Sequence, residues 1–159
     1  MVKIEWIITD DLSNISLNEF NNEWNGIISG YFELVINQVK VGFCPNRKIC
    51  EEEEGMEDIL YWLNHLLDGV NMIKKGVEYE IILLTMNLYK MNMKLGENME
   101  IYFINKKTNE IKWNEEVELQ EFENELYKST RKFLQVVKET NPELLKSKWM
   151  RRLISVDLY

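Results

Sequence analysis

The chain has 159 residues, of which 45% are hydrophobic and 29% charged, and its formal net charge is −8 at pH 7. This composition predicts one globular domain with a sizeable core and excludes a disordered chain. The negative charge argues against a general nucleic-acid surface. No apolar run approaches the ~18 residues of a membrane span and the N-terminus shows no signal-peptide pattern, so we expect a cytoplasmic protein.

The charge is unevenly distributed along the chain. Residues 1–125 contain 11 Lys/Arg and 24 Asp/Glu, whereas residues 126–159 contain 8 Lys/Arg and 3 Asp/Glu. An acidic body favours a basic partner, and the simpler alternative is a solvated surface that serves solubility. The chain has no alanine and is rich in Asn, Lys, Ile and Glu, a bias that indicates an AT-rich genome and a low-GC bacterium.

The first two elements have clear local patterns. Apolar and polar residues alternate over 2–9, which predicts a strand buried on one face. Ser16 followed three residues later by Glu19 forms a capping box, and this predicts a short helix over 17–24.

The strongest helical pattern in the chain follows the acidic run. Apolar residues recur at three- and four-residue steps over 59–73, which predicts a helix with one buried face packed across a sheet. We expect this central helix to begin near Gly55–Met56 and to end at Gly76, because glycine readily takes the left-handed conformation that terminates helices. Gly69 inside the pattern indicates close packing or a bend.

The remaining elements complete the expected fold. Further strands are predicted at 31–36, 39–43, 79–84, 86–95, 100–104 and 110–113, and further helices at 119–139 and 142–154, the last capped by Asn141. Runs of strands with a few helices indicate an α+β class. We therefore expect a single α+β domain over 1–159, with an antiparallel meander sheet of about six strands packed against two long helices plus a C-terminal helix.

Catalytic and metal-binding motifs are absent from the sequence. His65 is the only histidine, no glycine-rich phosphate loop is present, and Cys44 and Cys50 are spaced too widely for a common zinc site. We expect no catalytic residue, no metal and no cofactor, and two ordinary thiols. The alternative is a small-ligand or enzyme site of scattered polar residues near the central helix, such as Glu80, Tyr102 and His65.

Acidic clusters are the candidate partner-binding residues. They comprise Glu51, Glu52, Glu53, Glu54, Glu57 and Asp58 before the central helix, and Glu115, Glu116 and Glu118 before the second long helix. Neither cluster has the spacing of a calcium loop. The basic residues of the last segment, Lys146, Lys148, Arg151 and Arg152, are expected to balance neighbouring acidic helices, and contact with an anion or a nucleic acid is the alternative.

The layout resembles a known kind of bacterial protein. The segments GYFELVINQVKVGF, EDILYWLNHLLDGV and EIYFINKKTNEIKWNEEVELQEFENELYKSTRKFLQVV give a strand-turn-strand order followed by acidic helices. This order resembles the small acidic α+β immunity proteins of polymorphic toxin systems, and also other low-GC bacterial families of similar layout. The resemblance implies a non-enzymatic protein that neutralises a toxin by plugging or covering its active surface, and the acidic surface favours a basic toxin domain. The charge predicts no nucleic-acid partner and the lack of a long apolar run predicts no membrane contact, while the many aromatic residues leave a homo-oligomer open. These families share no catalytic motif, so no functional residue is carried over.

Overall fold

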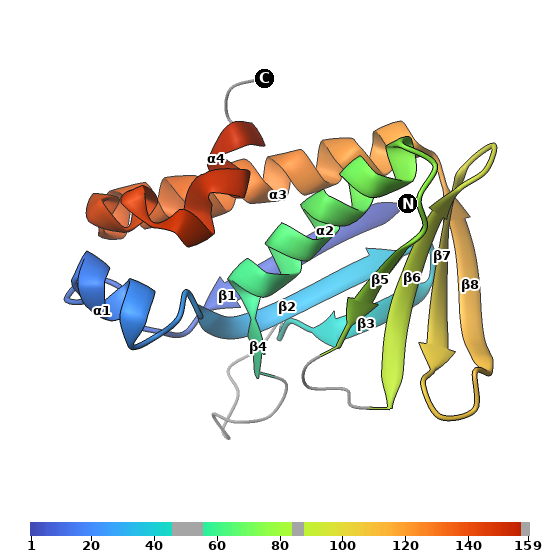
Figure 1. The fold of residues 1–159 in the computed structure, drawn as a ribbon, viewed down its shortest axis with the longest axis horizontal. Helices are drawn as coiled ribbons and strands as arrows, with labels where there is room; N and C mark the ends of the chain where they lie inside the picture. The colour runs from blue at the N-terminus through green and yellow to red at the C-terminus, as the bar shows by residue number, and fades with distance from the viewer. Residues whose placement is uncertain (46–55, 84–87, 157–159) are drawn as a thin grey trace.

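Two antiparallel sheets of four strands each form the frame of the molecule, which is seen in a computed structural model that describes residues 1–45, 56–83 and 88–156 (Figure 1). Sheet A consists of β1 (Val2–Ile8), β2 (Ser29–Ile36), β3 (Val39–Phe43) and β4 (Met56–Asp58). Sheet B consists of β5 (Tyr79–Ile82), β6 (Tyr89–Leu95), β7 (Met99–Asn105) and β8 (Ile111–Val117). The helices are α1 (Leu17–Asn22), α2 (Ile59–Lys74), α3 (Leu119–Thr140) and α4 (Arg151–Val156), with 3-10 helices η1 (Pro142–Lys146) and η2 (Lys148–Met150).

Sheet A has β2 at its centre. β2 pairs with β1 along one edge. Along its other edge, β2 pairs with β3 and with β4 at different parts of its length. The predicted hairpin between β2 and β3 is confirmed, and Asn37 in its turn takes a positive φ of 55°, which asparagine tolerates better than most residues. The alternation predicted for the first strand is also confirmed, because Val2 and Ile4 are buried while Lys3 is exposed.

Sheet B is a meander in which each strand pairs with the next one in the chain. Its inner face carries the fully buried side chains of Ile81, Met91, Met93 and Ile101. Because side chains alternate across a strand, the residues between these positions point to the opposite face.

Helix α2 packs against both sheets and joins them into one core. Its Trp62 ring stacks on Phe32 of β2, with ring centroids 4.9 Å apart. At Gly69, an added Cβ would lie 2.7 Å from the Met93 sulfur of β6, so this glycine permits close packing of the helix on sheet B. The buried side chains of both sheets and of the helices form a single hydrophobic cluster.

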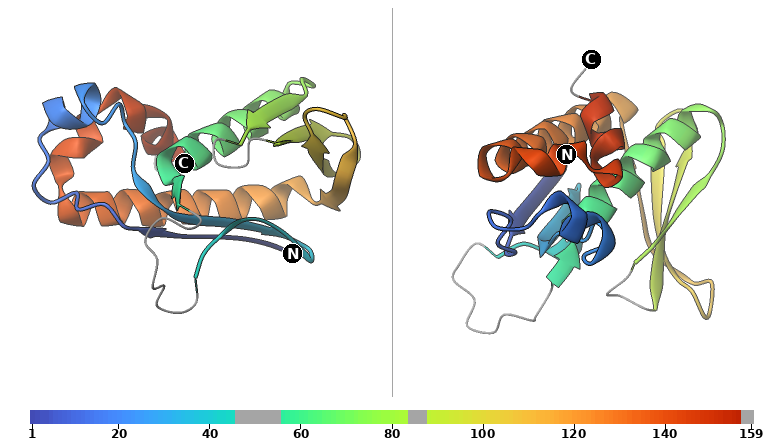
Figure 2. Two further views of the ribbon diagram at one scale, coloured as in Figure 1. Left: turned by 90° about the horizontal axis from the view of Figure 1, so that it is seen from below. Right: turned by 60° about the vertical axis from the view of Figure 1, so that its left-hand side comes forward.

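Helix α3 runs along β1 and spans most of the length of the molecule (Figure 2). It begins directly after β8 of sheet B and continues past sheet A toward α1. Ser16 caps α1 as predicted, accepting a hydrogen bond from the Glu19 amide at 3.1 Å. The predicted range 119–139 of α3 agrees closely with its observed bounds.

The α+β class is confirmed, and four details of the prediction need correction. The strands form two four-stranded sheets instead of one six-stranded meander. The central helix begins at Ile59, because Met56–Asp58 pairs with β2 as a short strand. The predicted strand 110–113 extends to Val117, and of the predicted strand 86–95 the structure describes Tyr89–Leu95.

The fourth correction concerns the C-terminal helix, which is broken into η1, η2 and α4. Ser147 lies between η1 and η2 and is fully buried. Asn141 does not cap η1 with its side chain, since its amide donates instead to the carbonyl oxygens of Leu12 and Ile15, both at 2.8 Å.

Candidate functional site

The first acidic cluster divides into two parts. Glu51, Glu52, Glu53 and Glu54 lie outside the described residues. Glu57 is only 8% exposed, and its carboxylate accepts a hydrogen bond from the Trp62 indole at 3.3 Å. Glu57 therefore lies in the core and not on the surface.

Asp58 is the N-cap of α2. Its carboxylate accepts hydrogen bonds from the amides of Tyr61 at 3.2 Å and Ile28 at 3.3 Å, which joins the helix to the segment before β2. Burial raises the pKa of the Asp58 carboxyl, and the backbone hydrogen bonds oppose this shift. Glu57 and Asp58 thus both fix the entry into the central helix, and neither presents a free carboxylate to a partner.

The second cluster also has two environments. Glu115 points to the inner side of sheet B, where it pairs in register with Ile101. Its carboxylate accepts a hydrogen bond at 2.8 Å from Asn37, in the β2–β3 turn of the other sheet. Glu116 and Glu118 are exposed, and neither forms an ion pair within the part of the chain that the structure describes.

Glu116 belongs to the outer face of sheet B, which no helix of the described chain covers (Figures 1 and 2). The strand register arranges this face in three rows that cross the sheet. The isoleucine row contains Ile82, Lys90, Ile104 and Ile111; the central row contains Glu80, Asn92, Tyr102 and Asn114; the acidic row contains Lys94, Glu100 and Glu116.

The isoleucine row leaves apolar surface in contact with water. Ile82 is 42% exposed and Ile111 is 52% exposed, and Ile104 between them is half-buried. A single exposed isoleucine is ordinary. Ile104 and Ile111 are direct register partners on this uncovered face and form an apolar pair, and Lys90 separates the pair from Ile82.

The acidic row contains an unfavourable contact. Glu100 and Glu116 are direct register partners on neighbouring strands, and like charges in this position destabilise a sheet. Lys94 partly compensates: it forms an ion pair with Glu100 at 3.2 Å and lies over the Tyr102 ring. Hydrogen bonds to Tyr102 and Glu100 raise the pKa of Lys94, so the ammonium is held on this row. Glu116 keeps the remaining negative charge.

The alternative site of scattered polar residues is not assembled. Glu80 and Tyr102 both lie in the central row of the outer face, separated by Asn92. His65 lies on α2, which packs against the inner side of the same sheet. The sheet therefore separates His65 from the other two side chains.

His65 has its own small polar environment. Its Nδ1 is 2.7 Å from the Tyr79 hydroxyl, and its ring lies against Tyr61 with centroids 4.1 Å apart. Burial, with a smaller contribution from Arg152, lowers the pKa of His65. The adjacent hollow measures about 200 Å³, below the range of typical small-molecule pockets. The histidine is partly buried.

Within the described residues, no group of three or more His, Cys, Asp and Glu side chains is arranged to hold a metal ion. Cys44 is a half-buried free thiol whose pKa is raised, mainly by burial, and Cys50 lies outside the described residues. A raised pKa keeps a thiol protonated and therefore poorly nucleophilic.

The rows of sheet B were not recognised in the sequence. The alternation in YKMNMKL and MEIYFIN separates buried methionines and isoleucines from polar residues, and it could have defined the outer face. Comparison with protein-family models, with curated proteins and with solved structures finds no match to this chain. Among the helices described, none combines the length and apolar character that crossing a membrane requires.

Proposed function

We propose that this chain is a non-enzymatic protein-binding module that docks a basic protein partner through the outer face of sheet B. The observation that carries the proposal is the direct pairing of Glu100 with Glu116 on a face that also exposes isoleucines, in the row beyond the polar central row. A cationic partner would cover the apolar row and relieve the repulsion between the two carboxylates. Apolar surface next to charge is the usual composition of a protein interface.

The net charge of the face agrees with a basic partner. Glu78, which accepts a hydrogen bond from Asn92 at 3.1 Å, adds to the three glutamates of the rows, and Lys90 and Lys94 oppose them. Complementary charge speeds association and discriminates against acidic competitors. The resemblance to immunity proteins supplies a setting: the partner would be a basic toxin domain, and binding would neutralise it.

Two charge-reversal variants test the proposal in a pull-down from the native host. The first variant combines Glu100→Lys with Glu116→Lys. The control combines Glu23→Lys with Glu143→Lys, because both residues are exposed. Glu23 is the C-cap of α1 and Glu143 lies in η1, which contacts α1, and α1 lies at the opposite end of the molecule from sheet B in Figure 1. Both variants change the net charge equally, so a difference between them reports the position of the charge.

We expect wild type and control to capture the same basic protein at low salt, and the Glu100/Glu116 variant to lose it. With the purified partner, the association rate should fall about tenfold or more for this variant. Equal capture by all three baits, or equal loss by both variants, would exclude the outer face of sheet B as the docking site.

A further inference from the structure

The outward side of α3 changes charge along its length. Its first half carries Glu121 and Glu125, whereas Glu139 is the one acidic residue between positions 128 and 140. Four exposed cations occupy this second half: Lys128, Arg131, Lys132 and Lys138. We call the surface formed by these four residues and the two hollows beside them the basic groove.

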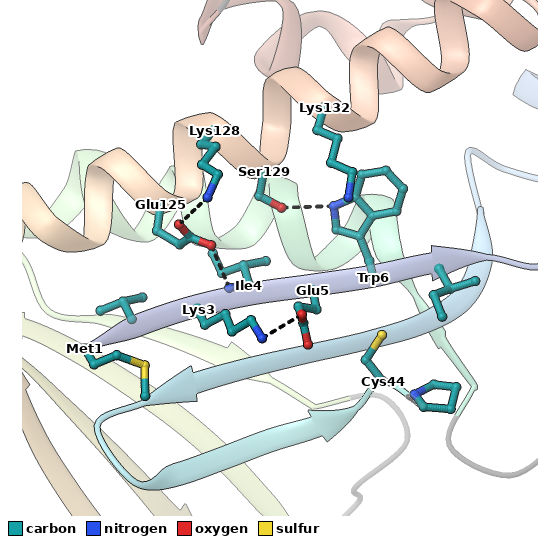
Figure 3. Close-up of a pocket in the computed structure, with 13 residues that line it drawn as sticks. Met1, Lys3, Ile4, Glu5, Trp6, Cys44, Glu125, Lys128, Ser129 and Lys132 are labelled. Carbon is teal, nitrogen blue, oxygen red and sulfur yellow. Dashed lines mark hydrogen bonds and ion pairs between the residues drawn. The ribbon is translucent and has the colours of Figure 1, made fainter. Parts of the chain in front are cut away.

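The first hollow lies along the edge of β1 opposite its partner strand β2, and its volume is about 610 Å³ (Figure 3). The edge itself is closed by α3, because the amides of Val2 and Ile4 each donate to a glutamate carboxylate, of Glu121 and Glu125, at 3.1 Å. Lys128 and Lys132 reach from α3 toward the strand above this closed edge. The amides of Val2 and Ile4 are therefore occupied, and the lysine side chains line the hollow beside them.

Trp6 anchors this side of the groove. Its indole N–H donates to the Ser129 hydroxyl at 2.9 Å, and the Lys132 ammonium lies 5.3 Å from the centre of its ring. Lys128 forms an ion pair with Glu125 at 3.5 Å, but this carboxylate also holds the Ile4 amide. Lys128 and Lys132 are therefore positioned beside β1 by their contacts with Glu125 and with the Trp6 ring.

The second hollow, about 640 Å³, adjoins the first at Lys132 and has an apolar floor. Leu134 of α3, Leu145 of η1 and Ile154 of α4 form the floor. Arg131 and Lys138 stand on the α3 side of the same hollow. Apolar floor and cationic rim together define what fits: a ligand with both apolar and anionic groups.

We propose that the basic groove binds an acidic protein segment that also presents apolar side chains. Charge complementarity selects the acidic groups, and the floor at Leu145 and Ile154 selects the apolar ones. A nucleic acid fits less well, because proteins bind its bases by stacking them on aromatic side chains, whereas the floor of the second hollow consists of the aliphatic Leu134, Leu145 and Ile154. The site is independent of the proposed function, since it lies on α3 and has the opposite charge.

A labelled helical peptide of about 14 residues, or four turns, is a suitable probe. This peptide carries Leu on one face of the helix and Glu elsewhere. A second peptide has Ser in place of Leu. A single-stranded DNA of equal charge is the nucleic-acid probe. The test variant combines Arg131→Glu with Lys138→Glu. The control combines Lys75→Glu with Lys107→Glu, two exposed cations outside the groove.

We expect the Leu/Glu peptide to bind wild type at low salt, with affinity reduced about tenfold or more by the groove variant and little by the control. The Ser/Glu peptide and the DNA should bind more weakly than the Leu/Glu peptide. Equal loss in both variants, tighter binding of the DNA, or no binding of the Leu/Glu peptide would overturn the proposal.

A measurement on the wild-type chain avoids any effect of the variants on folding. In a methyl NMR titration, the peptide should shift the signals of Leu145 and Ile154 before those of Ile82 and Ile111 on sheet B. Shifts confined to sheet B would contradict the groove while leaving the proposed function open. Loss of a host partner in the Glu100/Glu116 variant is a separate result, so the two proposals can fail independently.

Discussion

Closing the edge of β1 with carboxylates from α3 should contribute measurably to stability, and Glu125→Ala tests this contribution. The Glu125 side chain is 18% exposed, and it accepts the Ile4 amide at 3.1 Å. A hydrogen bond to a charged group contributes roughly 1.5–3 kcal/mol, and partial exposure favours the lower end. The ion pair with Lys128 adds less than about 0.5 kcal/mol, because Lys128 is 78% exposed. We therefore expect a loss of about 1.5 kcal/mol in the free energy of unfolding.

Urea unfolding followed by circular dichroism measures this loss. With a slope of about 2 kcal/mol per molar urea, the midpoint should fall by roughly 0.7 M. Glu125→Gln keeps a neutral acceptor and should fall between wild type and the alanine variant. Glu139→Ala is the control on the same helix, since this exposed residue accepts a hydrogen bond from the exposed Gln135 side chain and should change stability by less than about 0.5 kcal/mol. Equal midpoints for Glu125→Ala and Glu139→Ala would refute the reasoning.

Three further predictions concern single positions. The pKa of His65 is lower in the folded chain than in the unfolded chain, so the unfolded chain takes up the proton first as the pH falls, and the free energy of unfolding decreases. The contribution of His65 to stability is therefore present above its unfolded pKa and is lost as the pH falls. The His65→Gln variant should show a smaller decrease in the free energy of unfolding between about pH 7 and pH 5. Gly30→Ala should cost about 2 kcal/mol or more in denaturant unfolding, since the new Cβ would lie 2.0 Å from the Ile7 carbonyl oxygen, whereas Gly96→Ala, with its nearest atom at 3.9 Å, should be nearly neutral. Asn141→Ala removes two hydrogen bonds of 2.8 Å to the loop before α1 and should lower the thermal midpoint, at a cost of about 1–2 kcal/mol; an unchanged midpoint would show that water replaces the amide.

The local patterns that predicted elements correctly are those where neighbouring residues alone decide the conformation. The alternation of β1 and the three- and four-residue repeat of α3 are of this kind, and so is the cap at Ser16. The start of α2 is different. Glu57 follows an acidic run of the kind that favours the first turn of a helix, yet it lies in a strand. The reason is that its segment pairs with β2 and its carboxylate accepts a hydrogen bond from the Trp62 indole.

The division into two sheets depends on contacts that are distant in sequence. β1 of sheet A alternates in the same way as β6 and β7 of sheet B, so this alternation does not distinguish one six-stranded sheet from two four-stranded ones. α2 makes the division by contacting β2 with Trp62 and β6 with Gly69. The candidate site could not be predicted for the same reason. The alternation in β6 and β7 separates two faces of the sheet, but it does not indicate which face a helix covers.

The bonds that close β1 also have a consequence for synthesis of the chain on the ribosome. They join residues 119, 121 and 123 positions apart, so the first strand emerges long before the helix that covers its edge. At roughly 5–20 residues per second, this interval lasts about 6–25 s. During that time the amides of Val2 and Ile4 lack their carboxylate acceptors, and an open strand edge readily pairs with other chains. We therefore expect nascent chains that stall before α3 to aggregate, and the yield of folded protein to depend on how quickly α3 is completed.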